Sequence, residues 1–407
     1  MITGIRLQAT RSTPRLREGL HGSSFEFWGF LVGAIDGLVF VSYIFEIDQT
    51  VYYSATVALK IALFLLRREK LTEASRAVLP FIYILILSEI ASSLWNDVSA
   101  LSSARILVFS VNLFVTLNFL GTPYWRGLVF VSVIDATVYL VFYQTGRLVD
   151  FYGRTLFFSA SHPNLGSELF FSAAFGALLI RMPKVSFALT PLFFAPTFLM
   201  QGRAAELGIL AVACILFWHA SRNLSPLTRL LLILTTLIAG GALLFTLDVS
   251  DLANKVLLLD NQYRGENTNA SGRNLYWASA FEAWATNPLF GAGSDFPARL
   301  GMLQPHNFFL YPIAYYGLMG LIVLFILLSK FAYVAVFGRA LYLVPFVPML
   351  AFNDRFVNLN TYPAIMFLFL FHEFARAKKA RQHLTTSLPG TAKNYSRRES
   401  LDFKNSP

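Results

Sequence analysis

The sequence is organised around residues 271–320, which read SGRNLYWASAFEAWATNPLFGAGSDFPARLGMLQPHNFFLYPIAYYGLMG. This stretch opens with Arg273 and continues through a segment that contains two tryptophans. It then turns at a Gly-Ala-Gly sequence and places His306 and Asn307 at the start of a long apolar run. Polar side chains set so close to apolar runs suggest a functional site near a membrane.

The composition indicates an integral membrane protein. Of the 407 residues, 56% are hydrophobic and only 14% are charged, whereas soluble domains carry about 25% charged residues. Repeated apolar runs are long enough to cross a bilayer. Because these runs are continuous rather than alternating, and because backbone groups in lipid must be paired internally, we expect an all-α, polytopic membrane helical bundle. The single cysteine, Cys214, rules out an intrachain disulfide framework or a Cys-based metal site.

We predict about 12 transmembrane helices from the apolar runs. They lie at roughly 27–45, 51–66, 78–95, 104–120, 126–143, 165–181, 185–201, 204–219, 227–247, 307–328, 340–352 and 361–374. This assignment divides the chain into a cytoplasmic amino-terminal segment (1–26), spans one to nine (27–247), one long extracytoplasmic loop (248–306), spans ten to twelve (307–374) and a cytoplasmic basic tail (375–407). The polar residues after Arg376 predict disorder.

The distribution of charge sets the predicted orientation. The net charge is +10, and about 23 of the 33 Lys and Arg residues fall on one side if the amino terminus is cytoplasmic. The excess of Lys and Arg residues therefore orients the protein in the membrane and contacts anionic lipid. It does not indicate a nucleic-acid partner. We expect both termini in the cytoplasm and the chemistry on the extracytoplasmic face, because the longest connection lies there.

Four ionisable residues fall inside predicted spans: Asp36, Lys60, Glu89 and Asp135. A charge in the membrane is costly, so each predicts a partner or a polar cavity. Asp36 and Lys60 stand on adjacent spans and are expected to pair. For all four, a structural role within the bundle is favoured over a catalytic one.

The long loop contains a predicted interfacial helix. Ser271 is a suitable amino-terminal cap, and Asn287-Pro288 is expected to end the helix. Trp277, Phe281 and Trp284 recur at helical spacing and predict an apolar stripe that lies on the membrane or on the top of the bundle. This stripe is expected to pack and to position Arg273.

Three further features stand at predicted helix starts on the same side. His306 precedes span ten, where the positive end of the helix dipole disfavours imidazolium and favours a neutral base; the alternative is a capping residue. Arg203 precedes span eight, where a cation needs an anion nearby, either a ligand or Glu206 one turn later. His162 and Asn164 precede span six in the sequence SHPNLG, which is also compatible with a capped turn.

Together these residues suit a membrane-embedded polyanion. The arginine fork matches phosphate oxygens, and helix amino termini attract anions. The sequence shows no metal-ligand spacing, and the acidic pair Asp248 and Asp251 is interpreted as a helix end. No metal and no cofactor are therefore expected.

The stretch 272–320 resembles the O-antigen ligase and polysaccharide polymerase superfamily of bacterial membrane proteins. The resemblance rests on Gly272-Arg273, the aromatic helix with Trp277, the sequence NPLFGAG at 287–293, His306-Asn307 and the small-residue segment 317–320. Residues 202–210, GRAAELGIL, are similar to another motif of this group, with Gly202 in place of the usual small hydroxyl residue. HPNLG at 162–166 is similar to a motif of its polymerase members.

The resemblance implies an inverting, metal-independent glycosyl transfer from undecaprenyl diphosphate to a sugar hydroxyl. Arg203 and Arg273 would then bind the diphosphate, and His306 would accept or orient the proton of the acceptor. His162, Asn164 and Asn307 would contact the donor or the acceptor. A flippase and a chain-length regulator are implied as partners, besides the lipid-linked oligosaccharide, the sugar acceptor and membrane lipid.

Three functions remain open on the sequence. A lipid-linked acceptor would make the protein a polymerase of O-antigen, capsule or exopolysaccharide, and the HPNLG element favours this function. A lipid A–core acceptor would make it an O-antigen ligase. A sugar or lipid-linked oligosaccharide transporter is the weaker alternative, because the sequence shows no half-to-half repeat and its polar groups gather at one surface.

Overall fold

The computed structural model of the chain describes residues 21–67, 70–150, 154–159, 162–222, 224–225, 227–229, 234, 273–302, 305, 307–352, 356 and 362–387. These residues form fourteen α-helices and one short 3-10 helix, with no strand among them. The all-α prediction is therefore confirmed. The predicted span at 227–247 lies almost wholly outside the described residues.

The first half of the chain is a series of helices joined by short connections. They are α1 (His21–Gly37), α2 (Val39–Ile44), α3 (Gln49–Arg67), α4 (Glu73–Asn96), α5 (Ala100–Leu117), α6 (Thr122–Gln144), α7 (Pro163–Leu179), α8 (Pro183–Leu199) and α9 (Arg203–Ala220). The second half contains α12 (Arg273–Thr286), α13 (Phe296–Leu300), α14 (Leu310–Phe337), η2 (Ala340–Leu343), α15 (Phe346–Phe352) and α16 (Tyr362–Ser387).

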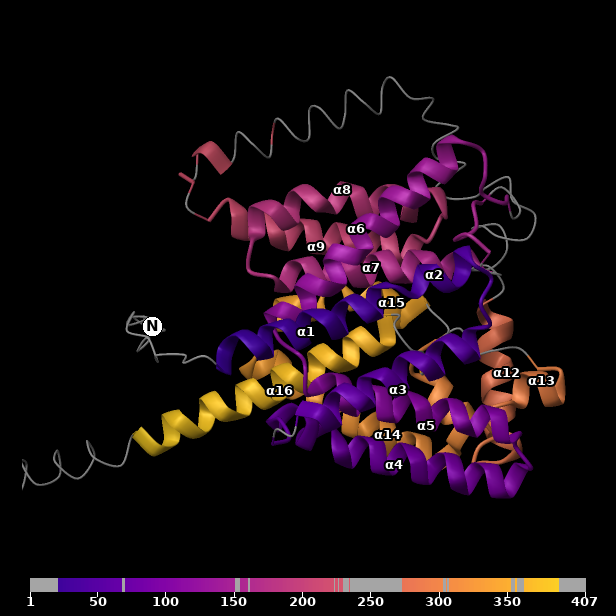
Figure 1. Cartoon of the computed structure of the whole chain (residues 1–407). Coiled ribbons are helices and arrows are strands. Elements are labelled where there is room, and N and C mark those ends of the chain that lie inside the picture. Colours follow the sequence, from indigo (N-terminus) through magenta and orange to yellow (C-terminus); the bar gives the residue numbers. More distant parts are fainter. Residues whose placement is uncertain are drawn as a thin grey trace, which may run out of the picture.

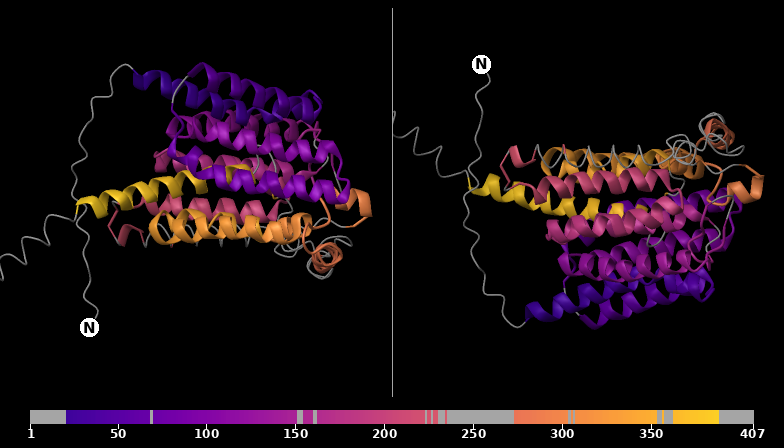
Figure 2. Two further views of the ribbon diagram at one scale, coloured as in Figure 1. Left: turned by 90° about the horizontal axis from the view of Figure 1, so that it is seen from below. Right: turned by 90° about the horizontal axis from the view of Figure 1, so that it is seen from above.

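The long helices run along one common axis (Figure 1). Helix α12 lies across this axis at one end of the bundle, with α13 beside it. The start of α1 and the end of α16 both lie at the opposite end (Figures 1 and 2). We call the end that carries α12 the α12 end.

Six helical segments among the described residues are long and apolar enough to cross a membrane. They are Glu26–Ile44, Glu73–Asn96, Ala100–Leu117, Thr122–Gln144, Arg203–Ala220 and Leu310–Phe337. Helices α3, α7, α8 and α16 coincide with four more of the predicted spans. The structure is thus a polytopic membrane helical bundle.

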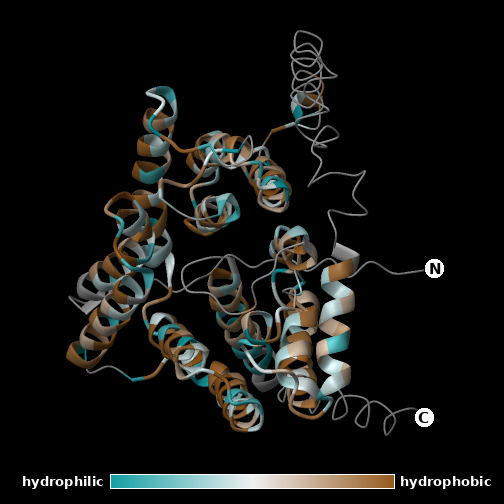
Figure 3. Ribbon diagram, turned by 90° about the vertical axis from the view of Figure 1, so that its right-hand side faces the viewer, coloured by the Kyte–Doolittle hydropathy of each residue, from teal (hydrophilic) through white to brown (hydrophobic). Residues whose placement is uncertain are grey.

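The outer surface of the bundle is apolar. Leu94 is 81% exposed, Phe325 74% and Leu66 73%, and hydrophobic residues predominate around the long helices in the view along the bundle axis (Figure 3). Such a surface is unfavourable in water and suits lipid.

Helix α7 forms the centre of the bundle. Every described residue of its sequence except Asn164 is buried, because α6, α8, α9 and α16 surround it. A helix that is apolar on all faces is stable only in such a position or in lipid. The start of α7 is thereby held in a fixed place among its neighbours.

Two predictions about the carboxy-terminal spans need correction. The predicted span at 340–352 is divided into η2 and the short α15. Disorder from Arg376 onward is wrong for residues 376–387, because α16 continues as a helix to Ser387. Its last turns carry Lys378, Lys379 and Arg381, which are good helix formers despite their charge.

The structure confirms the helix predicted in the long loop. Helix α12 packs against α14. Its buried residues are Ala280 and Ala283, Trp277 and Trp284 are partly buried, and Phe281 is 51% exposed. Small alanines allow two helices to approach closely, and a phenylalanine at the end of a membrane bundle can face lipid instead of protein.

The predicted pair of Asp36 and Lys60 is confirmed, within a larger buried network. The ammonium of Lys60 donates to Asp36 Oδ1, to Asn112 Oδ1 at 2.7 Å and to Thr116 Oγ1 at 3.3 Å. The Tyr124 hydroxyl donates to Asp36 Oδ2 at 2.8 Å. Four helices, α1, α3, α5 and α6, are therefore joined by one fully paired charge network.

Removal of one member of this network should destabilise the bundle strongly. We expect Lys60→Met to lower the free energy of unfolding by about 3–5 kcal/mol, because it leaves the Asp36 carboxylate buried without its cation. The double variant Lys60→Met with Asp36→Leu should recover much of this loss. Thermal unfolding in detergent measures both, and equal losses in the single and the double variant would contradict the pairing.

Candidate functional site

The α12 end of the bundle gathers the helix starts that carry the predicted site residues. Helices α7, α9 and α14 begin there, and the connections between α6 and α7 and between α8 and α9 lie there (Figures 1 and 2). Two polar regions can be built from the described side chains at this end. One joins α7 to the corner between α8 and α9, and the other joins the end of α4 to the loop that follows α12.

The first region is centred on Arg154, which lies in the connection between α6 and α7 and is 2% exposed. Its guanidinium donates to the carbonyl oxygen of Met200 at 2.7 Å and to that of Gln201 at 3.1 Å. It also donates to Asn164 Oδ1 at 2.8 Å. The start of α7 and the corner before α9 are therefore tied to one side chain.

Close backbone packing joins the same two motifs. A Cβ at Gly202 would lie 2.1 Å from Ser167 Oγ of α7, which is far inside the contact distance. Only glycine fits at this position while Ser167 occupies the space. This explains why Gly202 stands where a small hydroxyl residue is usual in the resembling motif.

Arg203 is the first residue of α9, and its side chain is partly buried. Glu206, one turn later, interacts electrostatically with both Arg203 and Arg154. The local carboxylate that the sequence offered as an alternative partner is therefore present. The Glu206 carboxylate therefore has two arginines in its neighbourhood.

His162 and Asn164 shape the start of α7. His162 is the amino-terminal cap, and its Nδ1 accepts a hydrogen bond from the backbone N–H of Asn164 at 3.2 Å. This contact requires a lone pair on Nδ1. The capped-turn interpretation of HPN is thus confirmed for His162, while Asn164 binds Arg154 through its side chain.

The second region is built on a break in α14. Gly317 has a non-helical backbone with φ 58°, which divides the helix. The NPLFGAG loop docks against this break: Ala292 N donates to Ala314 O at 2.8 Å, Gly293 N to Tyr315 O at 3.2 Å, and Leu318 N to Pro288 O at 2.9 Å.

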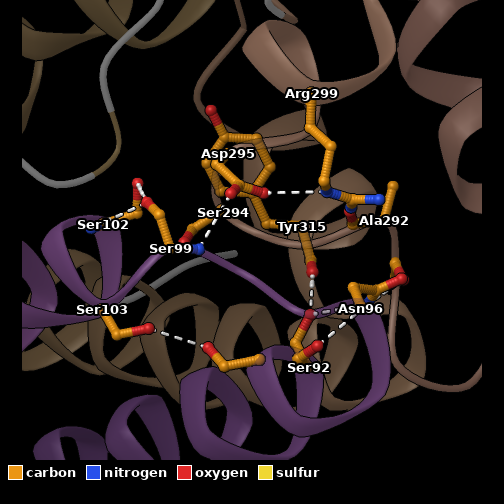
Figure 4. Close-up of polar contacts among 12 residues, drawn as sticks. Ser92, Asn96, Ser99, Ser102, Ser103, Ala292, Ser294, Asp295, Arg299 and Tyr315 are labelled. Atoms are coloured by element: carbon orange, nitrogen blue, oxygen red, sulfur yellow. Dashed lines mark hydrogen bonds and ion pairs between the residues drawn. The ribbon is translucent and has the colours of Figure 1, made fainter.

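The end of α4 fixes the same loop from the other side. Asn96 Nδ2 donates to the carbonyl oxygen of Gly291 at 3.0 Å, and its Oδ1 accepts from Asn287 Nδ2 at 3.1 Å. Ser92 donates to the carbonyl oxygen of Tyr315 at 2.9 Å. Figure 4 shows the contact between Ser92 and Tyr315, with Asn96 beside it.

Charged side chains complete this second region. Asp295 accepts from the backbone N–H of Ser99 at 3.0 Å and from Arg299 Nε at 3.2 Å (Figure 4). Arg299 also donates to the carbonyl oxygen of Ala292. Its charge is therefore used to hold the loop.

Glu89, one of the intramembrane residues singled out from the sequence, supports the loop from inside the bundle. Its Oε1 accepts hydrogen bonds from Ser93 at 3.1 Å, Ser103 at 2.9 Å and Ser294 at 2.8 Å. These contacts confirm a structural role. Asp135 is also buried, but its Oδ1 has no hydrogen-bond partner among the described residues.

The remaining predicted residues are only partly described. Arg273 begins α12, which fixes its backbone, but its side chain and the whole of His306 lie outside the described residues. Asn307 Oδ1 accepts from the backbone N–H groups of Phe309 at 2.9 Å and Leu310 at 3.2 Å. Asn307 thus satisfies amide groups at the start of α14.

The segment that follows His306 is anchored next to α15. Phe308 is fully buried, and its backbone N–H donates to the carbonyl oxygen of Leu350 at 3.3 Å. Helix α15 packs in turn on α9, the helix that begins with Arg203. Through this chain of contacts the structure connects the start of α14 to α9.

The sequence interpretation missed Arg154 and Asn96. A signal for Arg154 was present, because a basic residue in a predicted outer connection departs from the positive-inside rule. Asn96 has no comparable signal, since its partner Gly291 is far away in the chain.

Within the described ranges, no three His, Cys, Asp or Glu side chains gather as they do around a metal ion.

Comparison with known families supports the resemblance drawn from the motifs. Residues 188–325 match the family model described as O-antigen ligase. The matched segment runs from α8 through most of α14 and contains Arg203, Arg273 and the position of His306. The resemblance to the O-antigen ligase and polymerase superfamily is thereby confirmed, and the match indicates a ligase- or polymerase-type membrane enzyme. No curated protein matches the chain.

The docking of the NPLFGAG loop on α14 can be tested at Gly317. A Cβ there would lie 2.4 Å from the carbonyl oxygen of Pro288, so Gly317→Ala adds a steric overlap to the cost of a positive φ, which is about 1–2 kcal/mol by itself. We expect a clearly larger fall in thermal stability than for the matched control Gly301→Ala. Gly301 also has a positive φ, 63°, but no atom within 4 Å of its would-be Cβ. Equal stability losses in the two variants would contradict the docking.

Proposed function

We propose that the protein is an inverting membrane glycosyltransferase that uses undecaprenyl-diphosphate-linked glycan as donor and a sugar hydroxyl as acceptor. Its favoured activity is polymerisation of repeat units into a surface polysaccharide, that is O-antigen, capsule or exopolysaccharide. The observation that carries the proposal is the pair of arginines, Arg203 and Arg154, at the corner where α7 and α9 begin, together with the match of residues 188–325 to the O-antigen ligase family model.

This corner suits the diphosphate of the donor. Backbone N–H groups at a helix start and an arginine side chain can both donate to phosphate oxygens. We propose that Arg203 and Arg273 bind the diphosphate and stabilise the negative charge that grows on it as it leaves. Because arginine charge serves this purpose, the proposed reaction needs no metal ion.

The acceptor side of the reaction is assigned to His306. In the proposed step, the acceptor oxygen attacks the anomeric carbon from the face opposite the diphosphate, and the carbon–oxygen bond to the diphosphate breaks. The acceptor proton passes to neutral His306, or His306 orients it. Attack from the opposite face inverts the anomeric configuration.

We propose that His162, Asn164 and Asn307 line the sugar-binding region, since all three stand at helix starts at the α12 end. Each already makes a hydrogen bond that shapes its helix start. Their contribution to catalysis is therefore expected to be smaller than that of Arg203, Arg273 or His306.

Ligation of O-antigen to lipid A–core is the second candidate function, because the matching family is described as O-antigen ligase. Both reactions use the same donor and differ in the acceptor. The HPNLG sequence at 162–166 favours polymerisation. In either case we place the site on the periplasmic side of the bacterial inner membrane, with a flippase and a chain-length regulator as partners.

The proposal is tested with the surface glycans of a strain that lacks this gene. Wild type, Arg203→Gln and His306→Ala are added back, and membrane lipid and surface polysaccharide are separated on one gel. We expect at least about a 100-fold loss of product for both variants, in line with the loss of a transition-state contact. Arg222→Gln is the matched control, because Arg222 is exposed beyond the opposite end of α9.

The pattern of accumulated glycan separates the candidates. Single repeats on the carrier, with single-repeat product still at the surface, indicate a polymerase. Long chains on the carrier, with bare lipid A–core, indicate a ligase. Unchanged surface glycan in the deletion strain would contradict the transferase and favour transport, whereas full activity of either variant would contradict the role assigned to that residue.

A further inference from the structure

Arg154 is a buried cation in an unusual place. It lies in the connection between α6 and α7 at the α12 end, is 2% exposed, and is among the largest fully buried side chains of the described part of the chain. Burial of a guanidinium is costly unless hydrogen bonds and charge compensate for the lost water. A residue that only linked two helices need not carry a charge.

The compensation comes from groups on both sides of the proposed diphosphate site. Met200 and Gln201, whose carbonyl oxygens accept from Arg154, follow the carboxy-terminal end of α8. The negative end of that helix dipole favours a cation. The third acceptor, Asn164 Oδ1, belongs to the first turn of α7.

These contacts control the residue that precedes the diphosphate-binding corner. Gln201 has a left-handed backbone with φ 51°, which a non-glycine residue adopts only when its surroundings hold it there. The Arg154 guanidinium binds its carbonyl oxygen, two residues before Arg203. The direction in which the chain enters α9 therefore depends on Arg154.

Arg154 also sets the electrostatics of the corner. Glu206 interacts with both Arg154 and Arg203. With Arg154 in place, the two cations share the Glu206 carboxylate. Without Arg154, Glu206 would balance Arg203 alone, and the attraction for an anion would fall.

We propose that Arg154 is a positioning residue that couples Asn164 at the start of α7 to Arg203 at the start of α9 and thereby shapes the diphosphate site. This inference rests on the proposed function, in which Arg203 binds the diphosphate. Arg154 itself is buried beneath the corner and does not contact the substrate. Lysine cannot replace it fully, because one ammonium lacks the planar fork that reaches acceptors on two elements.

The test is a double-mutant cycle on ligand binding by the purified full-length protein in detergent. The probe is farnesyl diphosphate, with farnesol as the matched ligand that lacks the diphosphate. We expect Arg154→Gln and Asn164→Ala each to weaken farnesyl diphosphate binding about 10-fold while farnesol binding is unchanged. The double variant should also lose about 10-fold, not 100-fold, which is a coupling free energy of about 1.4 kcal/mol.

Two variants serve as controls. Arg154→Lys should recover only part of the affinity for farnesyl diphosphate, because it keeps the positive charge but lacks the planar guanidinium. It also takes the place of Arg154→Gln in the test if Arg154→Gln does not fold. Arg222→Gln, at an exposed position beyond the opposite end of α9, should leave binding unchanged and be additive with Arg154→Gln.

The outcomes distinguish this inference from the proposed function. Additive losses in the double variant, or parallel losses for farnesol and farnesyl diphosphate, would overturn the positioning role and leave Arg154 as a general support of the fold. Unchanged diphosphate affinity in Arg154→Gln and Arg154→Lys would overturn it as well. If the wild-type protein does not prefer farnesyl diphosphate over farnesol, both the proposed function and this inference fail.

Discussion

The arrangement of the α12 end depends on one backbone contact, the docking of the NPLFGAG loop against the break in α14. Gly291 and Gly317 both have positive φ, and a Cβ on either would lie 2.4 Å from backbone of the opposite segment. Backbone hydrogen bonds then join the loop to both halves of the broken helix. Since the loop is continuous with α12, this contact fixes α12 relative to both halves of α14. Gly291 and Gly317 are therefore structural residues, and under the proposed function they position Arg273 and His306.

Buried polar networks hold the rest of the bundle around this contact. The network of Asp36 and Lys60 joins four helices on one side, and Glu89 joins α4, α5 and the NPLFGAG loop through three hydroxyl groups. In lipid there is little hydrophobic force between helices, so packing and polar contacts decide how they associate. The two networks fix the helices whose ends form the site, while lipid surrounds the apolar surface.

The sequence allowed most of the fold to be predicted, because hydrophobic runs and the distribution of basic residues determine spans and their order. It also predicted the Asp36–Lys60 pair, since two opposite charges on adjacent spans have few other partners. It did not reveal Arg154 or Asn96, whose roles depend on contacts between segments distant in the chain. On α12, Trp277 and Trp284 are partly buried whereas Phe281 of the same predicted stripe is exposed. The prediction ended α16 too early, because charged residues that leave the membrane can remain helical.

The central claim is that arginine side chains at the α12 end, rather than a metal ion, stabilise a departing lipid diphosphate. The most direct measurement is the release of undecaprenyl diphosphate from a lipid-linked glycan by the purified protein in proteoliposomes that contain a metal chelator. The account predicts release coupled to glycan transfer with the chelator present, and its loss in Arg273→Gln. Release that requires an added divalent metal ion, or that persists unchanged in Arg273→Gln, would contradict it.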